Sequence, residues 1–499
     1  MNEQKQMDQI TKQSQAHRPG RRRLRAAMAA VPVCLSLAAC APLPRATPAA
    51  GFPVPATYPE QPLQARDTAA VAPQPGWQDF FLDPELRRVI GVALENSREL
   101  RTAALRVQEA AAAYGIQRAE QLPVVNGSLQ ATRALVPPAQ SFIGRPIMGN
   151  QFQAGIGFSQ WELDVWGRLR SLNESALASW LASDEARRAT TVSLIAQVAD
   201  AYLGLREIDE RLALARRTRE LRDETVRIFR RRYELGAASR LNLTQVELLQ
   251  QQAIAQVAQL EQARAQQGAV LDLLAGAPVT LAPALDALGT VPLAREPAPG
   301  LPSDLLLERA DIAAAEQQLR AAHANVQAAR AAFFPRIALT ATAGASSTSL
   351  NELFNDDSRA WNFAPSLALP IFNGGRLKGQ LSVAQLRSEE AVAQYERAIQ
   401  GAFRDVADAL AARRGLAAQA EATRATLVLQ AERARLAQLR FESGAAAYLE
   451  VLDAERERFG AEQQLVQLRR QQLSAQVALY RALGGGAQRL PATDAGAIR

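Results

Sequence analysis

The sequence predicts a mainly α-helical chain with transmembrane β-strands, built twice from one unit in which a β-hairpin carries a long antiparallel helical hairpin. Three observations predict it. The sequence repeats itself at an offset of 208 residues, four short segments alternate between apolar and polar residues, and two stretches of nearly 70 residues keep a helical period.

The N-terminal residues 1–39 are expected to be an export signal. Five arginines between Arg18 and Arg25 precede a 14-residue uncharged run that is too short to span a bilayer. The run leads into Leu37-Ala38-Ala39-Cys40, which resembles the lipobox of bacterial lipoproteins, so Cys40 is the predicted lipidation site. Ordinary cleavage nearby and a spare apolar cysteine are the alternatives. Ala41 follows the cysteine, and the absence of Asp there favours delivery to the outer membrane.

Charge and composition exclude several classes of function. Removing residues 1–39 leaves 50 of the 57 basic and 48 of the 50 acidic side chains, a net charge of +2, so no nucleic-acid partner is expected. With 2 Cys and 2 His in the chain, a Cys/His metal cage, a Cys/His dyad and a disulfide framework lack the residues they need. Phosphate-binding, zinc-protease and serine-hydrolase motifs are not found. We therefore expect no enzyme activity, cofactor or bound metal.

The mature chain is expected to have five parts. A Pro/Ala-rich tether carrying the lipid anchor precedes repeat 1, a Pro-rich linker in the equatorial region separates repeat 1 from repeat 2, and a short tail ends the chain. The boundaries are 40–76, 77–276, 277–302, 303–484 and 485–499.

Each repeat should open with a helix, at about 83–120 and 303–332, that stops before a proline. Two strands of about ten residues follow in each repeat, because polar and apolar residues alternate there with a period of two. The alternating segments lie at 125–132, 152–159, 337–346 and 361–369.

After Gly167 and Gly375 the period becomes helical as far as Leu235 and Ser443, which corresponds to roughly 100 Å of helix in each repeat. Apolar residues in the first of these helices alternate spacings of four and three, as in a coiled coil. They lie at 194, 198, 201, 205, 208, 212 and 215. A glycine then ends each helix, and the chain returns as a second helix.

Four amphipathic strands suit a membrane wall, yet one chain cannot use them alone. Lipid leaves an open sheet edge unsatisfied, and a four-stranded barrel has no lumen. The chain is therefore expected to be a subunit of an oligomer. The alternative is that the strands are soluble and pack against the helices.

Taken together, several motifs resemble the TolC-like outer-membrane efflux channels, specifically their lipoprotein branch. These motifs are Trp77–Phe81 with Asp83–Leu86, Trp161–Arg168, Leu369–Arg376 and Gly444 through Ala454. The resemblance implies a homotrimer with a 12-stranded β-barrel in the outer membrane and an α-barrel in the periplasm. It also implies two partners, a periplasmic adaptor protein and an inner-membrane transporter.

The resemblance carries over to two kinds of site at the hairpin ends. Glu450 and Asp453 lie three apart on one helical face and match the acidic residues that ring the periplasmic gate of the family, where carboxylates favour cations. Gly236 and Gly444 match the tips that dock the adaptor. The alternatives are a solvated first helical turn and plain turn formers.

Two departures from the family affect the gate. Where some members place a Tyr and an Arg that close the entrance, this chain has Phe441 and Ala446. In repeat 1, Asn242 and Gln245 replace the two carboxylates, so one hairpin alone supplies acidic side chains.

The expected function is a passive exit duct for small compounds, lipid-anchored in the outer membrane and extending far into the periplasm. Two alternatives stay open. One is an exit duct of type I protein secretion, and the other is a non-conducting coiled-coil scaffold lipoprotein. Cargo, partner pump and opening trigger are not encoded in any motif found.

Overall fold

A computed structural model of the chain describes residues 54, 76–281, 288 and 309–486. These residues all belong to one of two compact units, which spans 52–499. The predicted signal, Cys40, most of the tether and linker, the start of the second-repeat helix and most of the tail lie outside the described residues.

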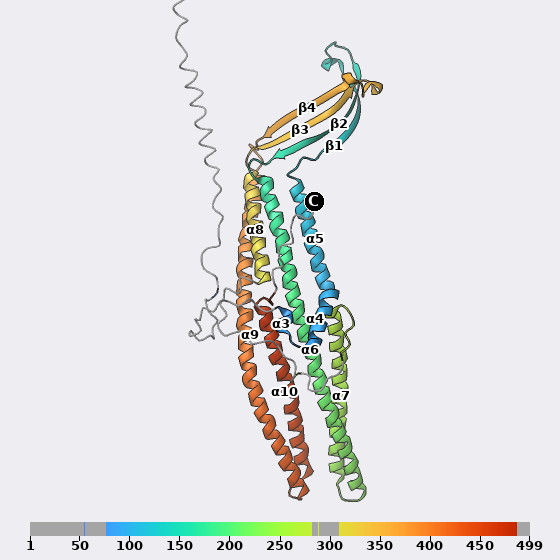
Figure 1. Cartoon of the computed structure of the whole chain (residues 1–499), viewed down its shortest axis with the longest axis vertical. Helices are drawn as coiled ribbons and strands as arrows, with labels where there is room; N and C mark the ends of the chain where they lie inside the picture. The colour runs from blue at the N-terminus through green and yellow to red at the C-terminus, as the bar shows by residue number, and fades with distance from the viewer. Residues whose placement is uncertain (1–53, 55–75, 282–287, 289–308, 487–499) are drawn as a thin grey trace, which may run out of the picture. The chain divides into compact units, whose positions relative to one another are not determined.

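Repeat 1 contains five helices (Figure 1). They are α3 (Trp77–Phe80), α4 (Pro84–Asn96), α5 (Arg98–Ala119), α6 (Arg168–Glu234) and α7 (Arg240–Ala275). The sequence predicted one helix over 83–120, which is wrong because the chain breaks at Ser97. This residue leaves the helical region, ends α4 by donating its N–H to the carbonyl of Ala93, and caps α5 by accepting the N–H of Leu100 at its side chain.

Repeat 2 follows the same plan with three described helices. They are α8 (Ala310–Ala331), α9 (Arg376–Glu442) and α10 (Tyr448–Ala482). The long helices α6 and α9 contain 67 residues each, and each begins after a glycine with positive φ. No helix in the described part of the chain is long and apolar enough to cross a membrane.

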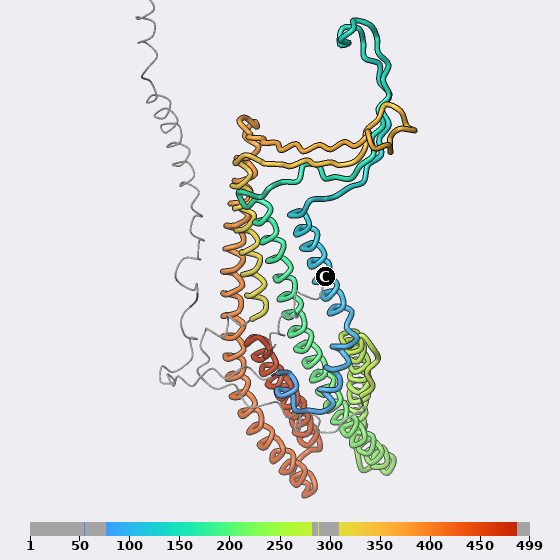
Figure 2. Tube along the Cα trace, turned by 45° about the horizontal axis from the view of Figure 1, so that its top comes forward, coloured from blue at the N-terminus to red at the C-terminus, as the bar shows by residue number. Residues whose placement is uncertain are grey.

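The four strands form one antiparallel sheet in the order β1-β2-β3-β4. They are β1 (Asn126–Val136), β2 (Ile147–Leu163), β3 (Arg336–Ser347) and β4 (Arg359–Ala368). Figure 2 shows them side by side with β1 and β4 at the margins. Short 3-10 helices lie between the paired strands at Pro138–Gln140, Leu350–Glu352 and Asp356–Ser358.

The register gives the sheet one apolar and one polar face. Cross-strand neighbours Ile156, Ala343 and Trp361 form one row, and Trp361 is 81% exposed. On the other face, Gly157, Thr342 and Asn362 form the adjacent row. Large apolar side chains are therefore exposed together on one face, as expected for a sheet that contacts lipid. This arrangement argues against soluble strands packed on helices.

A β-bulge resets this alternation in β2. The register shifts between Phe158 and Trp161, where Gln160 adopts φ 53° and its N–H donates to the hydroxyl of Thr340. Beyond the bulge the Trp161 indole N–H donates to the carbonyl of Gln121, 3.1 Å away, at the junction with α5. The bulge thus re-aims the end of β2 toward the helices.

The helices form a single wall in which α6 changes neighbours halfway. Near the sheet, contacts run in the order α5-α6-α8-α9, and near the far ends they run α7-α6-α10-α9 (Figure 1). Most of the predicted coiled-coil positions of α6 are buried, from Leu194 to Ala215, while Ile208 is half-buried. Sheet and wall therefore share two free margins, with β1, α5 and α7 on one and β4 and α9 on the other.

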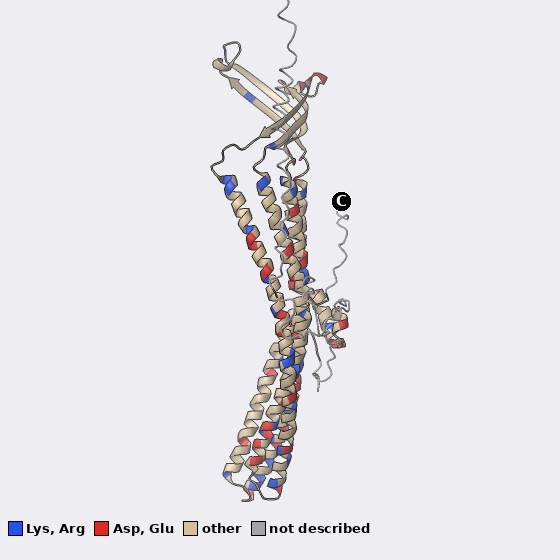
Figure 3. Ribbon diagram, turned by 90° about the vertical axis from the view of Figure 1, so that its left-hand side faces the viewer, with Lys and Arg blue, Asp and Glu red and all other residues tan. Residues whose placement is uncertain are grey.

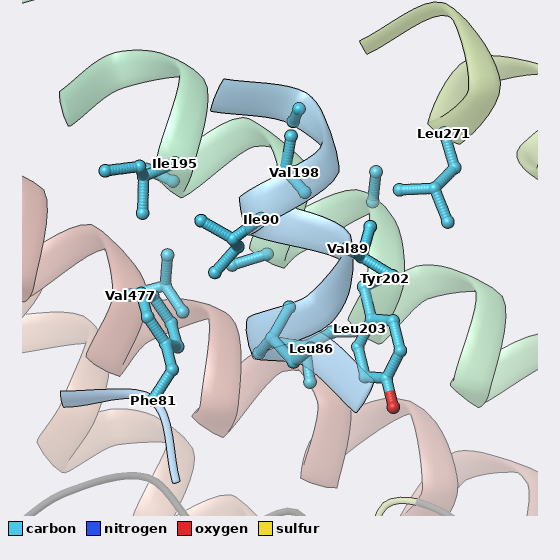
Figure 4. Close-up of a cluster of buried hydrophobic side chains, with 14 of the residues drawn as sticks. Phe81, Leu86, Val89, Ile90, Ile195, Val198, Tyr202, Leu203, Leu271 and Val477 are labelled. Atoms are coloured by element: carbon cyan, nitrogen blue, oxygen red, sulfur yellow. The ribbon is translucent and has the colours of Figure 1, made fainter. Parts of the chain in front are cut away.

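The main core lies where α6 changes neighbours. Figure 4 shows Leu86 and Ile90 of α4 against Val198 and Tyr202 of α6. The Tyr202 hydroxyl lies 2.8 Å from a carboxylate oxygen of Asp83, and burial raises the pKa of Tyr202 to about 12. This core fixes α4 to one face of the helical wall.

Candidate functional site at the hairpin tips

The two hairpin tips have the same backbone construction. Gly236 and Gly444 adopt φ of 72° and 77°, the left-handed region that glycine tolerates best. The next residue donates back five positions in both tips, Ala237 to the Arg232 carbonyl and Ala445 to the Arg440 carbonyl. These are Schellman caps, so each glycine reverses the chain within a tight turn.

The predicted gate residues lie on the first turns of α10, just beyond the second tip. Their side chains are 41% exposed for Glu450 and 40% exposed for Asp453, so both carboxylates reach solvent. A guanidinium nitrogen of Arg440 lies 2.5 Å from Glu450, and one of Arg433 lies 2.7 Å from Asp453. Arg456 also reaches Asp453, at 2.8 Å.

These pairs change the electrostatics expected from the sequence. Arg456 also contacts Glu457 at 3.2 Å, so three guanidiniums face three carboxylates in this cluster. Sequence reasoning placed the two acidic residues correctly on one helical face but missed Arg433 and Arg440. Both arginines lie on the helix that folds back along α10, and the sequence pattern of one helix does not show which of its residues face the other. These three arginines and three carboxylates carry no net formal charge within one chain.

The first tip lacks an equivalent cluster. Asn242 takes part in capping, because its backbone N–H donates to the Ser239 hydroxyl at 3.1 Å. The nearby ion pair joins Arg230 to Glu247 at 3.1 Å. Glu234 also pairs with Arg231 at this tip, so repeat 1 contributes acidic groups, but none at the positions that match Glu450 and Asp453.

An aromatic cluster joins the two hairpins near the tips. The ring of Tyr448 lies 4.4 Å from Phe229 of α6 and 4.9 Å from Phe441 of α9, measured between centroids. The guanidinium of Arg232 lies over both phenylalanine rings, at 5.6 and 5.8 Å. Phe441 thus makes an apolar link where some family members are expected to make a polar one.

Charged residues are distributed unevenly over the molecule (Figure 3). Red and blue positions are dense along the ribbon toward the tips, and the strands are almost free of them. Blue positions, which are Lys or Arg, lie at the helix ends beneath the sheet. Among the described residues, no three His, Cys, Asp or Glu side chains come together as a metal-binding group.

An outward apolar sheet face, a wall of very long helical hairpins and charged tips define an outer-membrane channel protein with a large periplasmic part. The chain belongs to the outer membrane efflux protein family, whose profile matches residues 89–277 and 301–485.

Three similar proteins illustrate the relationship. The toluene efflux pump outer membrane protein TtgI of Pseudomonas putida is 42% identical over 83% of this chain and 87% of its own length. A crystallised membrane protein of Pseudomonas aeruginosa is 40% identical, with a TM-score of 0.78 over 85% of this chain and 97% of that one. The open-state MtrE outer membrane channel of Neisseria gonorrhoeae is 35% identical, with a TM-score of 0.78 over 88% of this chain and 97% of that one.

Proposed function

We propose that this protein is the outer-membrane exit duct of a tripartite efflux system, which conducts exported small compounds passively to the outside. The observation that carries the proposal is the open, amphipathic four-stranded sheet in line with a single curved wall of helices. A protein with this construction can enclose a path only when copies of it close around a common axis.

Closure requires the two free margins of neighbouring copies to meet. The margin formed by β1, α5 and α7 differs from the margin formed by β4 and α9, so the contact is head-to-tail and generates a ring. Two copies would give eight strands, a number at which side chains fill the barrel. Three copies give twelve strands and an open lumen, so the proposed assembly is a homotrimer.

The direction of curvature follows from the position of α4. Because α3 and α4 pack on one face of the wall, three copies of them inside the tube would occupy its lumen. We therefore place that face outside and the opposite face toward the lumen. The lumen then ends at the hairpin tips, where Glu450 and Asp453 are the proposed gate residues.

The partners proposed are a periplasmic adaptor protein and an energised inner-membrane transporter, with Gly236 and Gly444 at the tips that meet the adaptor. The similarity to the toluene efflux protein TtgI supports small compounds as cargo. Secretion of a polypeptide through the same duct is the transport alternative. A non-conducting scaffold is the structural alternative, and the exposed apolar face of the sheet counts against it.

Planar-bilayer recording of the purified full-length protein tests the proposal. We expect small single-channel currents and, in detergent, a mass of three chains. A monomer without conductance would overturn the proposal and would favour the non-conducting scaffold instead. Loss of small-compound export in a deletion strain, with the secreted proteins unchanged, separates the efflux duct from a secretion duct.

Cys40 is the proposed lipid attachment site. Metabolic labelling with palmitate should mark the wild-type protein and not Cys40→Ala. Equal labelling of the two proteins would exclude this site while leaving the duct function intact.

A further inference from the structure

A groove of about 1040 Å³ lies between α6, α8 and α9, close beneath the sheet. Small side chains from all three helices form its floor, among them Ala182, Ala321 and Ala384. Ser183, Gln318 and Gln380 add hydroxyl and amide groups to its lining. The groove is therefore wide, largely apolar and supplied with neutral hydrogen-bonding groups.

Two arginines of α9, Arg376 and Arg387, supply the charge of this groove, and its lining includes no acidic residue. They are eleven residues apart, or roughly 16 Å along the helix. Within the described part of the chain, neither guanidinium has an ion-pair or hydrogen-bond partner.

The acidic residues nearest Arg376 are already engaged. Glu162 accepts from Arg168 at 2.8 Å and pairs with Arg336 at 2.7 Å. The carboxylate of Asp164 accepts the backbone N–H groups of Leu169 and Arg170, which caps α6. The groove therefore has two available positive charges and no counter-charge of its own.

The groove opens on the face of α6 that lies opposite α4. Asp184 precedes Tyr202 on α6 by 18 residues, which is about five full turns. The two residues therefore lie on the same side of α6, the side on which α4 packs. Ser179 and Ala186 of the groove are turned from Asp184 by roughly 140–160° at about 100° per residue. In the proposed trimer this is the lumen side, and three copies bring six guanidiniums to the duct wall, three at the level of Arg376 and three about 16 Å away at the level of Arg387.

We propose that this groove is a binding site for anionic amphipathic compounds on their way from the helical tube to the barrel. The inference rests on the proposed duct function and deepens it by naming a substrate class. The guanidiniums bind carboxylate, sulfonate or phosphate groups, and the small apolar floor accommodates the body of the compound. The site favours anions, in contrast to the neutral cluster at the tips.

The test uses the full-length protein and pyranine, an aromatic trisulfonate whose fluorescence anisotropy reports binding. The test variant is Arg376→Gln with Arg387→Gln. The matched control is Arg170→Gln with Lys378→Gln, which removes two positive charges at the same level outside the groove. We expect the test variant to bind pyranine at least about tenfold more weakly than the wild type, since it loses two charge-assisted contacts. The control should bind within about twofold of the wild type.

A second measurement separates this inference from the duct function. Pyranine added on the barrel side should reduce the current through wild-type channels in planar bilayers, and the test variant should resist this block. Conducting channels whose pyranine binding and block are the same in all three proteins would overturn the groove assignment and keep the duct. Equally weakened pyranine binding in the control would mean that any loss of positive charge has this effect. That result would also overturn the assignment. Absence of any wild-type current would overturn the duct instead.

Discussion

The guanidinium of Arg440 donates to the carboxylate of Glu450 across the second hairpin tip, with 2.5 Å between nitrogen and oxygen. The contact ties the last turn of α9 to the first turn of α10. Together with the bond from Arg433 to Asp453, it holds both proposed gate carboxylates against cations of the same chain. The proposed gate is thus a set of cross-helix ion pairs, and its charge depends on residues of the opposite helix.

Removing these two arginines should make the proposed duct more selective for permeating cations. In Arg433→Gln with Arg440→Gln, Glu450 loses its ion pair with Arg440 and Asp453 keeps only the pair with Arg456. Reversal potentials in a salt gradient should shift toward the cation potential. Thermal stability should barely change, because exposed ion pairs contribute about 0.2–1 kcal/mol each.

The control for this prediction is Arg424→Gln with Arg435→Gln. These arginines lie on the same helix and pair with Glu421 and Glu432 of that helix. Their loss should leave the reversal potential unchanged. An equal shift in both double variants would mean that pairing with the α10 carboxylates is not what sets the selectivity.

The aromatic cluster predicts a second way to loosen the tips. Tyr448→Ala removes the ring that contacts both Phe229 and Phe441, so the link between the two hairpins is weakened. We expect basal conductance to rise and the unfolding free energy to fall by about 1–3 kcal/mol, less than for a fully buried aromatic. Tyr448→Phe keeps the ring and should behave as the wild type. If Tyr448→Ala left the basal conductance unchanged, the aromatic cluster would have no role in closing the tips.

The buried Arg309 links the start of α8 to α9 and α10, so its loss should lower the stability of repeat 2. Arg309 precedes α8, is 8% exposed, donates to the Ala482 carbonyl at 2.8 Å, and pairs with Asp311 and Asp405 at 2.8 and 3.4 Å. Burial alone lowers its pKa, but the two carboxylates raise the pKa overall. Arg309→Met should lower the unfolding free energy by about 1–3 kcal/mol, below the value for fully buried pairs because both aspartates retain solvent contact. Thermal melting in detergent measures this, and an unchanged midpoint would contradict it.

The repeated elements could be predicted because their signals are local. Glycine at 236 and 444, proline at 123 and 335, and the helical period between them determine where each helix ends. The break at Ser97 was missed, although a serine three residues before Leu100 is a recognisable capping signal.

The charge of the proposed gate could not be predicted in the same way. Arg433 is twenty residues from Asp453 in sequence, and their contact exists only because the tip folds α9 back along α10. Periodicity reports which face a residue occupies on its own helix. It carries no information about the rotation of one helix relative to its neighbour, which decides what lies opposite that face. The arginine groove was missed for the same reason, since its lining comes from three separate helices.

A half-buried carboxylate on α10 predicts a pH-dependent stability. Burial raises the pKa of Glu462 above its ordinary value of 4.5, a further rise comes from Glu455, and the positive charge of Arg458 opposes it. The folded state therefore holds the proton more tightly than the unfolded state. Glu462 contributes most to stability below pH 4.5, and this contribution is lost as the pH rises through the folded-state pKa.

Glu462→Gln fixes the side chain in an uncharged form and should remove that loss. Its thermal midpoint should match the wild type near pH 4 and exceed it near pH 8, as measured by melting in detergent at the two pH values. The gain near pH 8 should grow in an Arg458→Gln background, because removing the nearby cation raises the pKa of Glu462 further and so increases the stability that is lost when this carboxyl ionises. A midpoint difference that is the same at both pH values would instead assign the effect to packing of the amide.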